Sequence, residues 1–201
     1  MACIINASTS AGLVQSADTS GNLVLQNDGT TKMTIGSSIT MNTGGLITSG
    51  TAVASTSGTS IDFTSIPSWV KRITVMFQSV STNGSSNVQV QLGISTGIDS
   101  TSTYKGSCSR NASIGTTNYT TGFLITQTVI STSVLEGCLQ LNLLSSNNWV
   151  GMGVIGYSDG AAGSFTAGSK SLSGTLDRIR ITTVNGTDAF DAGSVNILYE
   201  G

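Results

Sequence analysis

One alternating stretch, Val88-Gln89-Val90-Gln91-Leu92-Gly93-Ile94, indicates the class of fold that this chain adopts. Apolar residues stand at every second position, and Gln or Gly stands between them. Because successive side chains of a β-strand point to opposite faces of the sheet, this period is typical of a strand with one apolar and one polar face. The stretch therefore predicts a half-buried strand.

The same period recurs in both directions along the chain. Apolar residues alternate with polar ones around Val75, around Leu141 and around Ile197, and Ile179 and Ile181 alternate with arginines. β-Branched side chains suit the pleated surface of a sheet. We expect the inward faces to supply a core of Ile73, Val75, Phe77, Val88, Val90, Leu92, Leu139, Leu141, Ile179, Ile181 and Ile197.

Turn dipeptides separate these runs, namely Asn83-Gly84, Asp159-Gly160 and Asn185-Gly186. Such pairs accept positive φ and favour tight reversals. No segment has a capped apolar repeat of helical period. The pattern predicts an all-β fold, an antiparallel β-sandwich resembling a jelly roll, over residues 59–201. Its strands are expected at 59–63, 70–80, 87–95, 101–107, 119–130, 134–144, 148–157, 170–182 and 193–200.

Residues 1–58 have a different pattern. Their apolar residues come in short bursts such as Leu23-Val24-Leu25, separated by polar turns. The spacing of about ten residues predicts an extended segment of short strands that cannot bury enough apolar surface alone. We expect this segment to be ordered by other chains, intertwined in a trimer or lying on another protein. The stretch Thr48–Gly58, nearly all Ser, Thr, Gly and Ala, is expected to be a linker.

Composition excludes several classes of function. Charged residues make up 9% of the 201-residue chain and the net charge is −2, so the basic surface that nucleic acid requires is missing. No apolar run approaches the roughly 20 residues of a membrane helix. The first residues, Met1–Asn6, lack the pattern of a signal peptide, which predicts synthesis in the cytoplasm without export by that route.

The three cysteines are Cys3, Cys108 and Cys138. Their number is odd and their spacing is long, unlike a zinc site or a disulfide framework. Without a secretory signal, reduced and mostly buried thiols are favoured. A disulfide bridge between Cys108 and Cys138 is the alternative.

Two short motifs match catalytic patterns. Gly156-Tyr157-Ser158-Asp159-Gly160 matches the G-x-S-x-G elbow of hydrolases, but the chain contains no His to act as the base. Ser68-Trp69-Val70-Lys71 matches S-x-x-K, but it opens a predicted strand instead of lying on a helix. Both favour a structural interpretation, a hairpin tip and a strand start, and the chain is expected not to be an enzyme.

Metal and cofactor sites are not predicted. Asp177, Asp188 and Asp191 carry oxygen ligands that calcium prefers, but six to eight ligands are needed and no EF-hand loop is present. A solvated loop is favoured over a calcium site, and we expect no cofactor.

Aromatic residues supply the candidates for receptor contact. Tyr104 and Tyr119 flank the polar segment Lys105–Asn118, whose Ser, Gly and Asn content is typical of an adaptable recognition loop. Trp149 follows a polar turn and can serve as a platform for a sugar ring, although core packing is favoured for it, as for Trp69. Tyr104, Tyr119 and Trp149 are therefore the candidate contact residues.

One stretch resembles a known family. Gly58-Thr59-Ser60-Ile61-Asp62-Phe63-Thr64-Ser65-Ile66-Pro67-Ser68-Trp69-Val70-Lys71-Arg72-Ile73-Thr74-Val75-Met76-Phe77 resembles a segment of bacteriophage tail-fibre and related virion structural proteins. The likeness continues through 80–86 and 88–93, and 17–23 with 28–31 are similar to repeats in such proteins. The resemblance implies a non-enzymatic homotrimer with a β-rich knob, located on the virion at the capsid surface or in the tail. It carries over no catalytic residue.

Three hypotheses for the function follow. The favoured one is a virion surface protein, either a short homotrimeric fibre or a capsid-decorating (cement or head-fibre) protein. Residues 1–58 would attach it to major capsid or tail proteins, and the knob would contact host surface polysaccharide. The alternative is a free-standing, lectin-like carbohydrate-binding module. Least favoured is a tailspike glycosidase, which needs two facing carboxyl groups about 5–9.5 Å apart.

Overall fold

The structure is a computed structural model that describes residues 22–27, 29–35, 39–41, 47–111, 116–160 and 162–201. Within these ranges every regular element is a β-strand, as predicted. The chain divides into two compact units, Met1–Gly44 and Gly45–Gly201, and each is described by itself. We refer to the second unit as the knob.

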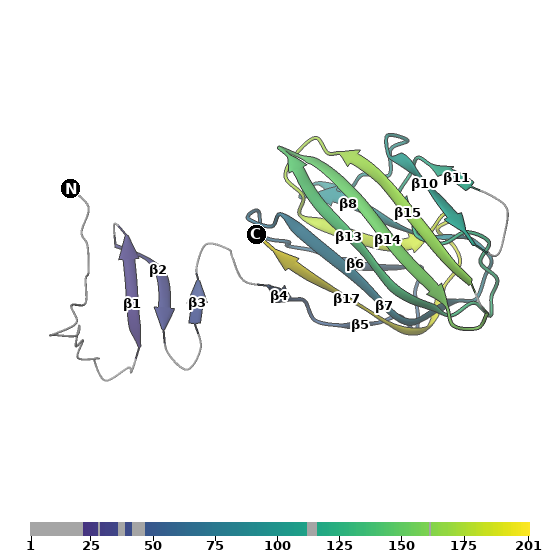
Figure 1. Ribbon diagram of the computed structural model, residues 1–201, viewed down its shortest axis with the longest axis horizontal. Coiled ribbons are helices and arrows are strands. Elements are labelled where there is room, and N and C mark those ends of the chain that lie inside the picture. Colours follow the sequence, from purple (N-terminus) through teal and green to yellow (C-terminus); the bar gives the residue numbers. More distant parts are fainter. Residues whose placement is uncertain (1–21, 28, 36–38, 42–46, 112–115, 161) are drawn as a thin grey trace. The chain divides into compact units, whose positions relative to one another are not determined.

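The N-terminal unit contains a small antiparallel sheet in the order β1-β2-β3 (Figure 1). Leu23 pairs with Ile35 and Leu25 pairs with Met33, which places these four apolar residues on one face of the first two strands. Leu23 and Leu25 are 39% and 41% exposed. The part of this unit that the structure describes contains three short strands. Their bounds are β1 Leu23–Asn27, β2 Thr30–Ile35 and β3 Ile39–Met41.

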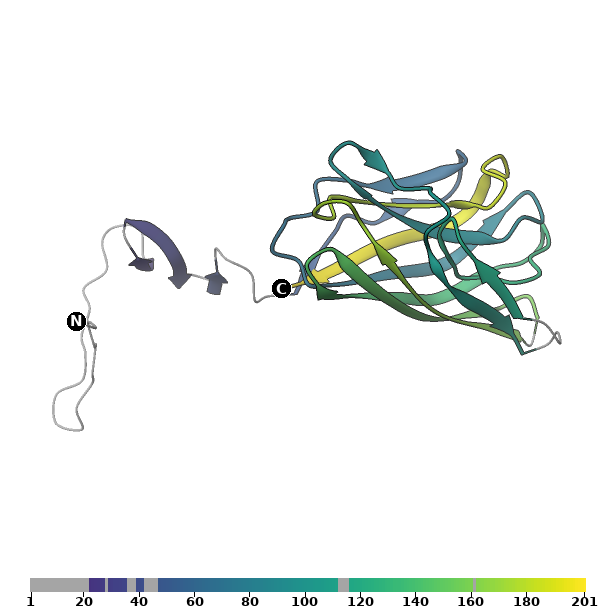
Figure 2. The ribbon, with the colours of Figure 1, turned by 90° about the horizontal axis from the view of Figure 1, so that it is seen from above.

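The knob consists of two antiparallel sheets (Figures 1 and 2). The larger sheet has the order β11-β10-β15-β14-β13-β7-β17-β4, with β5 also paired to β17. Its strands are β4 Thr48–Ser49, β5 Val53–Ala54, β7 Arg72–Thr82, β10 Lys105–Arg110, β11 Thr116–Tyr119, β13 Leu135–Ser145, β14 Asn148–Tyr157, β15 Ala162–Ser171 and β17 Phe190–Glu200.

The smaller sheet has the order β12-β8-β16-β6, and β9 pairs with β8 at one end. The two sheets enclose one core of buried side chains, which confirms the predicted sandwich. All eleven residues expected in the core are buried, from Ile73 to Ile197. The strands of this sheet are β6 Ser60–Phe63, β8 Val88–Ile94, β9 Gly97–Ile98, β12 Phe123–Leu124 and β16 Arg178–Thr183.

Three of the expected strands differ from those observed. The strand expected at 170–182 is two strands, the end of β15 and β16, joined by a loop in which Leu172 and Leu176 are buried. The run expected at 119–130 pairs only in short pieces, because Tyr119 ends β11 and Phe123 begins the two-residue β12. The strand expected from 101 begins at Lys105.

The polar face of β8 is buried, contrary to the half-buried strand expected there. Gln89 and Gln91 are 3% and 7% exposed because segment 121–122 covers them. Gln91 Nε2 donates to Thr121 O at 2.9 Å, and Thr121 Oγ1 donates to Gln89 Oε1 at 3.1 Å. The amide groups thus find partners inside the protein, as buried polar groups must.

Part of the expected linker, Thr48–Gly58, belongs to the edge of the larger sheet. Strand β4 pairs with Leu198 and Tyr199, and β5 pairs with Ser194 and Val195. Ser55 is fully buried, and its N–H donates to Gly193 O at 2.9 Å. Low apolar content suggested a flexible connection, but backbone hydrogen bonds to β17 bind this segment to the knob.

The G-x-S-x-G motif forms the tip of the β14–β15 hairpin. Strand β14 ends at Tyr157, and the next residue, Ser158, is exposed. The backbone N–H of Ser158 donates a hydrogen bond to Val134 O at 2.9 Å. The adjacent Asp159 accepts a hydrogen bond from Val134 N at 3.2 Å. This is the hairpin predicted for the motif. Ser68 lies in a turn closed by Val70 N donating to Pro67 O, so Ser68 and Lys71 share no helix.

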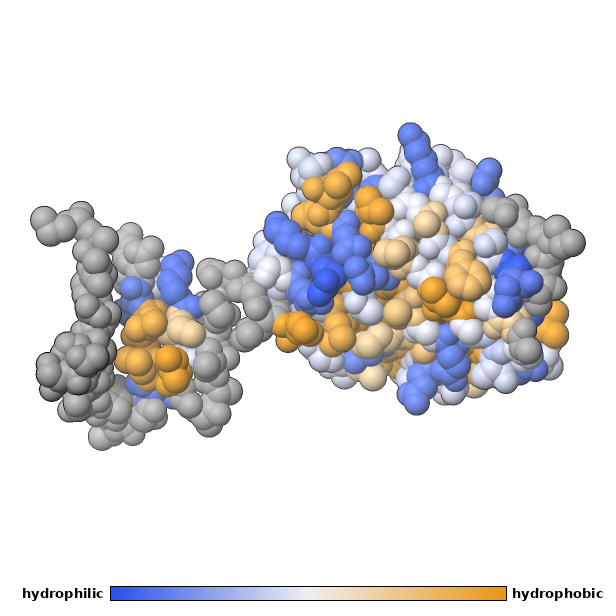
Figure 3. Space-filling model, in the orientation of Figure 1, coloured by the Kyte–Doolittle hydropathy of each residue, from blue (hydrophilic) through white to orange (hydrophobic). Residues whose placement is uncertain are grey.

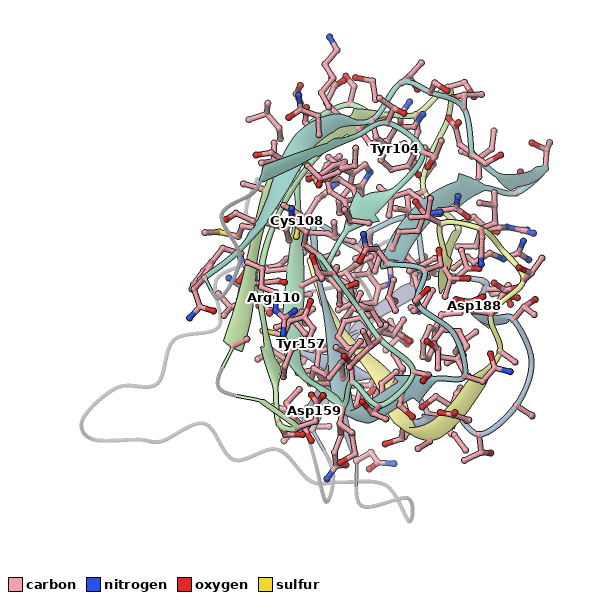
Figure 4. All side chains as sticks on the ribbon, turned by 90° about the vertical axis from the view of Figure 1, so that its right-hand side faces the viewer. Tyr104, Cys108, Arg110, Tyr157, Asp159 and Asp188 are labelled. Carbon is pink, nitrogen blue, oxygen red and sulfur yellow. The ribbon has the colours of Figure 1, made fainter. Side chains whose placement is uncertain are left out.

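The three aspartates considered for calcium have separate partners. Asp177 pairs with Arg178 and Asp191 accepts a hydrogen bond from Ser81. Asp188 accepts hydrogen bonds from Asn185 Nδ2 at 2.6 Å and Ser86 N at 2.8 Å, which hold the pKa of its carboxyl below the usual value. Figure 4 labels Asp188 far from Asp159. The described residues contain no cluster of three potential metal ligands.

Candidate binding groove

The three aromatic residues predicted to contact a receptor lie inside the knob. Tyr104, Tyr119 and Trp149 are 2%, 6% and 3% exposed. Large rings contribute most to core packing, and here the two sheets enclose them. Core packing, the favoured interpretation of Trp149, is confirmed. In this structure none of the three rings offers a face to a sugar.

Tyr104 belongs to a buried polar network. Leu92 N donates to its hydroxyl at 2.7 Å, and the hydroxyl donates to Asp99 O at 3.0 Å. Burial raises the pKa of the phenol far above its usual value. The ammonium of Lys170 lies 4.6 Å from the centre of the Tyr104 ring and 2.7 Å from Asp99 Oδ2. This cation is fully buried, and it is stabilised by the ring and the carboxylate together.

Tyr119 and Phe123 pack against a row of glycines. The registers align Gly106 with Gly168 and Gly168 with Gly151 across β10, β15 and β14. A Cβ atom at Gly168 would lie 2.2 Å from the Tyr119 hydroxyl, and one at Gly151 would lie 2.8 Å from Phe123 Cε1. The missing side chains make room for two aromatic rings whose centres are 6.0 Å apart.

A second buried polar cluster surrounds Tyr157. Its hydroxyl lies 2.9 Å from Ser164 Oγ and donates to Gln127 O at 3.0 Å. The Arg110 guanidinium lies 4.4 Å from the centre of the ring. Burial raises the pKa of the Cys108 thiol to about 11. Figure 4 shows Cys108, Arg110 and Tyr157 one below the other along one side of the knob.

This cluster does not provide an activated nucleophile at neutral pH. The thiolate is the reactive form of Cys, and a thiol with a pKa of about 11 is protonated at pH 7. Burial likewise raises the pKa of Tyr157, so the phenol keeps its proton. The chain also has no His to accept a proton from either group. We interpret the cluster as a structural hydrogen-bond network in the core, in which Arg110 Nε and Gln127 Oε1 are left without a partner.

One exposed polar site is a groove along one side of the smaller sheet, formed by three adjoining pockets. The central pocket, of about 290 Å³, is lined by Asp62, Arg178 and Arg180, among others. It shares Asp62 and Thr64 with a second pocket of about 270 Å³. It also shares residues with a third, of about 320 Å³. The shared residues on that side are Gly97, Ile98 and Ser100.

The charges that line the groove are compensated in pairs. Arg180 donates to both carboxylate oxygens of Asp62, at 2.7 Å each. The hydrogen bond to Asp62 raises the pKa of Arg180 above its usual value. Arg178 donates to Asp177 Oδ1 at 2.9 and 2.7 Å and to Ser95 O at 3.0 Å. The groove is thus polar but carries almost no net charge.

Such a surface suits a neutral, hydroxyl-rich ligand. Paired guanidinium and carboxylate groups hold each other in fixed planes and keep further donor and acceptor positions open. Asp62 and Arg180 are 37% and 38% exposed, so these positions are reachable. The sequence already showed Arg178 and Arg180 on the polar side of an alternating strand. Their meeting with Asp62, 118 residues earlier, depends on the pairing of β16 with β6.

Comparison with known proteins identified no relative of this chain. No protein-family model, curated protein or solved structure matches the chain. The resemblance of residues 58–77 to virion proteins therefore stays a prediction. In the part of the chain that the structure describes, no helix has the length and apolarity to cross a membrane.

Proposed function

We propose that this protein is a bacteriophage virion surface protein, a short homotrimeric fibre or a capsid-decorating protein, with no enzymatic activity. The observation that carries the proposal is the exposed apolar face of the β1–β2 pair. Leu23, Leu25 and Ile35 share this face at 39%, 41% and 37% exposure. A unit of short strands that leaves its apolar face uncovered needs other chains to bury it.

A three-fold arrangement suits this sheet. Three copies that turn the same face towards one axis bury the apolar side chains together, and the sheet leaves Val24 and Thr34 on its other face. Strand β3 extends this sheet by pairing Ile39 with Ile35 and Met41 with Met33. The trimer thus follows the usual rule that oligomers are symmetric and closed.

The composition agrees with a place on a virion. Only 9% of the residues are charged, and the net charge is −2. Weak charge limits repulsion between copies at the high local density of a particle surface. The resemblance of residues 58–77 to virion proteins independently supports a place on the virion.

The first test is the mass in solution. We expect the full chain to have close to three times the monomer mass of 20.4 kDa by light scattering. Leu25→Asp should reduce the assembly to monomers because it buries three like charges at the axis. Val24→Asp is the matched control, since Val24 is equally exposed, at 42%, on the opposite face. A monomeric wild-type chain, or equal effects of the two variants, would contradict the trimer.

The groove is the proposed contact for host surface polysaccharide. We expect the protein to bind neutral polysaccharide weakly, and Arg180→Ala to reduce binding at least tenfold, because it removes a donor and frees Asp62 from its fixed plane. Arg72→Ala is the control, since Arg72 also pairs with a carboxylate, Glu200, but outside the groove. Binding can be measured on a panel of immobilised bacterial polysaccharides. Equal losses in both variants would remove the groove from the proposal.

The alternative, a free-standing carbohydrate-binding module, is distinguished by the same two experiments. Such a module would bind polysaccharide as a monomer and would tolerate Leu25→Asp. The virion protein requires assembly, whether or not the groove binds a glycan.

A further inference from the structure

The outer face of the larger sheet is unusually apolar for a surface. Met152, Val154 and Val150 on β14 are 59%, 54% and 39% exposed, and Phe165 on β15 is 49% exposed. Figure 3 shows apolar side chains gathered over the middle of the knob, on the face where Figure 1 labels β13, β14 and β15. Scattered apolar residues are ordinary on a protein surface, but a contiguous patch indicates an interaction site.

The strand registers show that these residues are neighbours. Val154 pairs with Phe165 on one side and with Cys138 on the other, and Cys138 pairs with Met76. This row therefore crosses four strands without a charged or strongly polar side chain. The next row, Thr74, Gln140, Met152 and Ala167, has one hydroxyl, one carboxamide and no charge. We call these two rows the outer patch.

Strand β15 shows the reverse of the usual pattern. Its inward positions hold Ser164, Thr166 and Lys170, which are 1%, 6% and 2% exposed. In the first half of the strand the outward positions hold Phe165 and Ala167 instead, whereas Ser169 and Ser171 are the outward residues further along. An antiparallel sheet with one face in water normally turns its polar residues outward. The outward position of apolar residues on β15 is explained if another chain covers the outer patch in the assembled protein.

The absence of charged side chains from the outer patch indicates which kind of partner binds it. Where copies turn the same face towards a rotation axis, the residues nearest the axis meet their own equivalents, so that part of the face has to be free of charge. The charged outward residues Arg72, Lys105, Glu136 and Glu200 lie outside the two rows. A polyanion would require basic side chains, and a glycan would require more hydrogen-bonding groups than Gln140 provides.

We propose that the outer patch is the contact between the knobs of sister copies, which turn this face towards one another around the axis of the assembly. This inference deepens the proposed homotrimer and rests on it. The knob is then held by its own interface as well as by the N-terminal unit. Because the patch is made of residues on four hydrogen-bonded neighbouring strands, the contact has a fixed geometry.

Cys138 provides a direct probe, because it is an exposed free thiol in the middle of the outer patch. In a full-length Cys3→Ser background, a short bismaleimide should link Cys138 of one copy to Cys138 of another in most molecules. The matched control replaces Cys138 by Ser and places a cysteine at Val184, which is 52% exposed and lies outside the patch. This control should give at least tenfold less cross-linked product on a denaturing gel.

A second variant tests the contact itself. Val154→Asp in the Cys3→Ser background should lower the yield of the Cys138 cross-link at least fivefold and leave the circular dichroism spectrum unchanged. Val184→Asp in the same background should not lower the yield of the cross-link. If light scattering shows a trimer and Cys138 does not cross-link above the Val184→Cys control, the outer patch is not the interface and the homotrimer stands. If the full chain is monomeric, both proposals fail.

Discussion

Asp99→Ala is expected to destabilise the knob by about 3–5 kcal/mol, because it leaves the ammonium of Lys170 buried without its counter-charge. The Lys170 side chain is fully buried, and its Nζ lies 2.7 Å from Asp99 Oδ2. The two threonine hydroxyls that also bind this ammonium, from Thr101 and Thr103, are neutral and cannot replace the carboxylate. Urea denaturation measures the free energy of unfolding directly.

The control for this prediction removes the charge together with its partner. The double variant Asp99→Ala, Lys170→Met keeps an unbranched side chain over the Tyr104 ring and leaves no unpaired cation. It is expected to be more stable than Asp99→Ala alone. A double variant that is less stable would show that the ion pair is not the source of the loss.

The pH dependence of this contribution has a definite sign. Burial acts to raise the pKa of the Asp99 carboxyl, but hydrogen bonds from Lys170 and Thr101 outweigh it and hold the pKa below the ordinary value of 3.8. The folded state therefore binds this proton more weakly than the unfolded state. The stabilisation is complete above about pH 5 and is lost as the pH falls through the lowered pKa. Over that acid range the difference between wild type and Asp99→Ala should shrink.

Gly168→Val is expected to cost about 3 kcal/mol, the upper end of the usual loss when a packed core is overfilled. A Cβ atom at this position would lie 2.2 Å from the Tyr119 hydroxyl and 2.4 Å from Lys105 O. The second neighbour is backbone, so a side-chain rotation cannot relieve the overlap. The free energy of unfolding, measured in urea, reports the loss.

Gly163→Ala is the matched control on the same strand, because its Cβ would meet nothing closer than Ile155 O, at 3.6 Å. That variant should change the stability by less than about 0.5 kcal/mol, as is usual for substitutions away from packed features. Equal losses at Gly163 and Gly168 would mean that strand propensity, and not the space for Tyr119, determines the effect.

The alternation of apolar residues was sufficient to predict the sandwich and its core, since Val75, Leu92 and Ile181 point inward where the period places them. It could not predict β15, because Phe165 and Ala167 point outward while Ser164 and Thr166 point inward. A rule that assigns apolar residues to the core fails wherever a sheet has an apolar outer face.

The candidate site was predictable only in part. A ring beside a polar loop suggested a contact residue at Tyr104 and Tyr119, but the glycine row and Lys170 give these rings their places in the core. The arginines of the groove were visible in the sequence as the polar side of β16. Their pairing with Asp62 depends on a strand neighbour 118 residues away, which local patterns do not contain.

Attachment to virus particles tests the virion assignment most directly. A chain lacking residues 1–44 should fold as a soluble knob, because strands β4 to β17 all lie in the second unit. When particles assembled without the protein are mixed with purified chains, the full chain should bind and be visible by electron microscopy at capsid or tail positions, and the truncated chain should not. Full-length protein that does not bind particles would contradict the virion assignment. Truncated protein that binds with equal occupancy would contradict the role of the N-terminal unit.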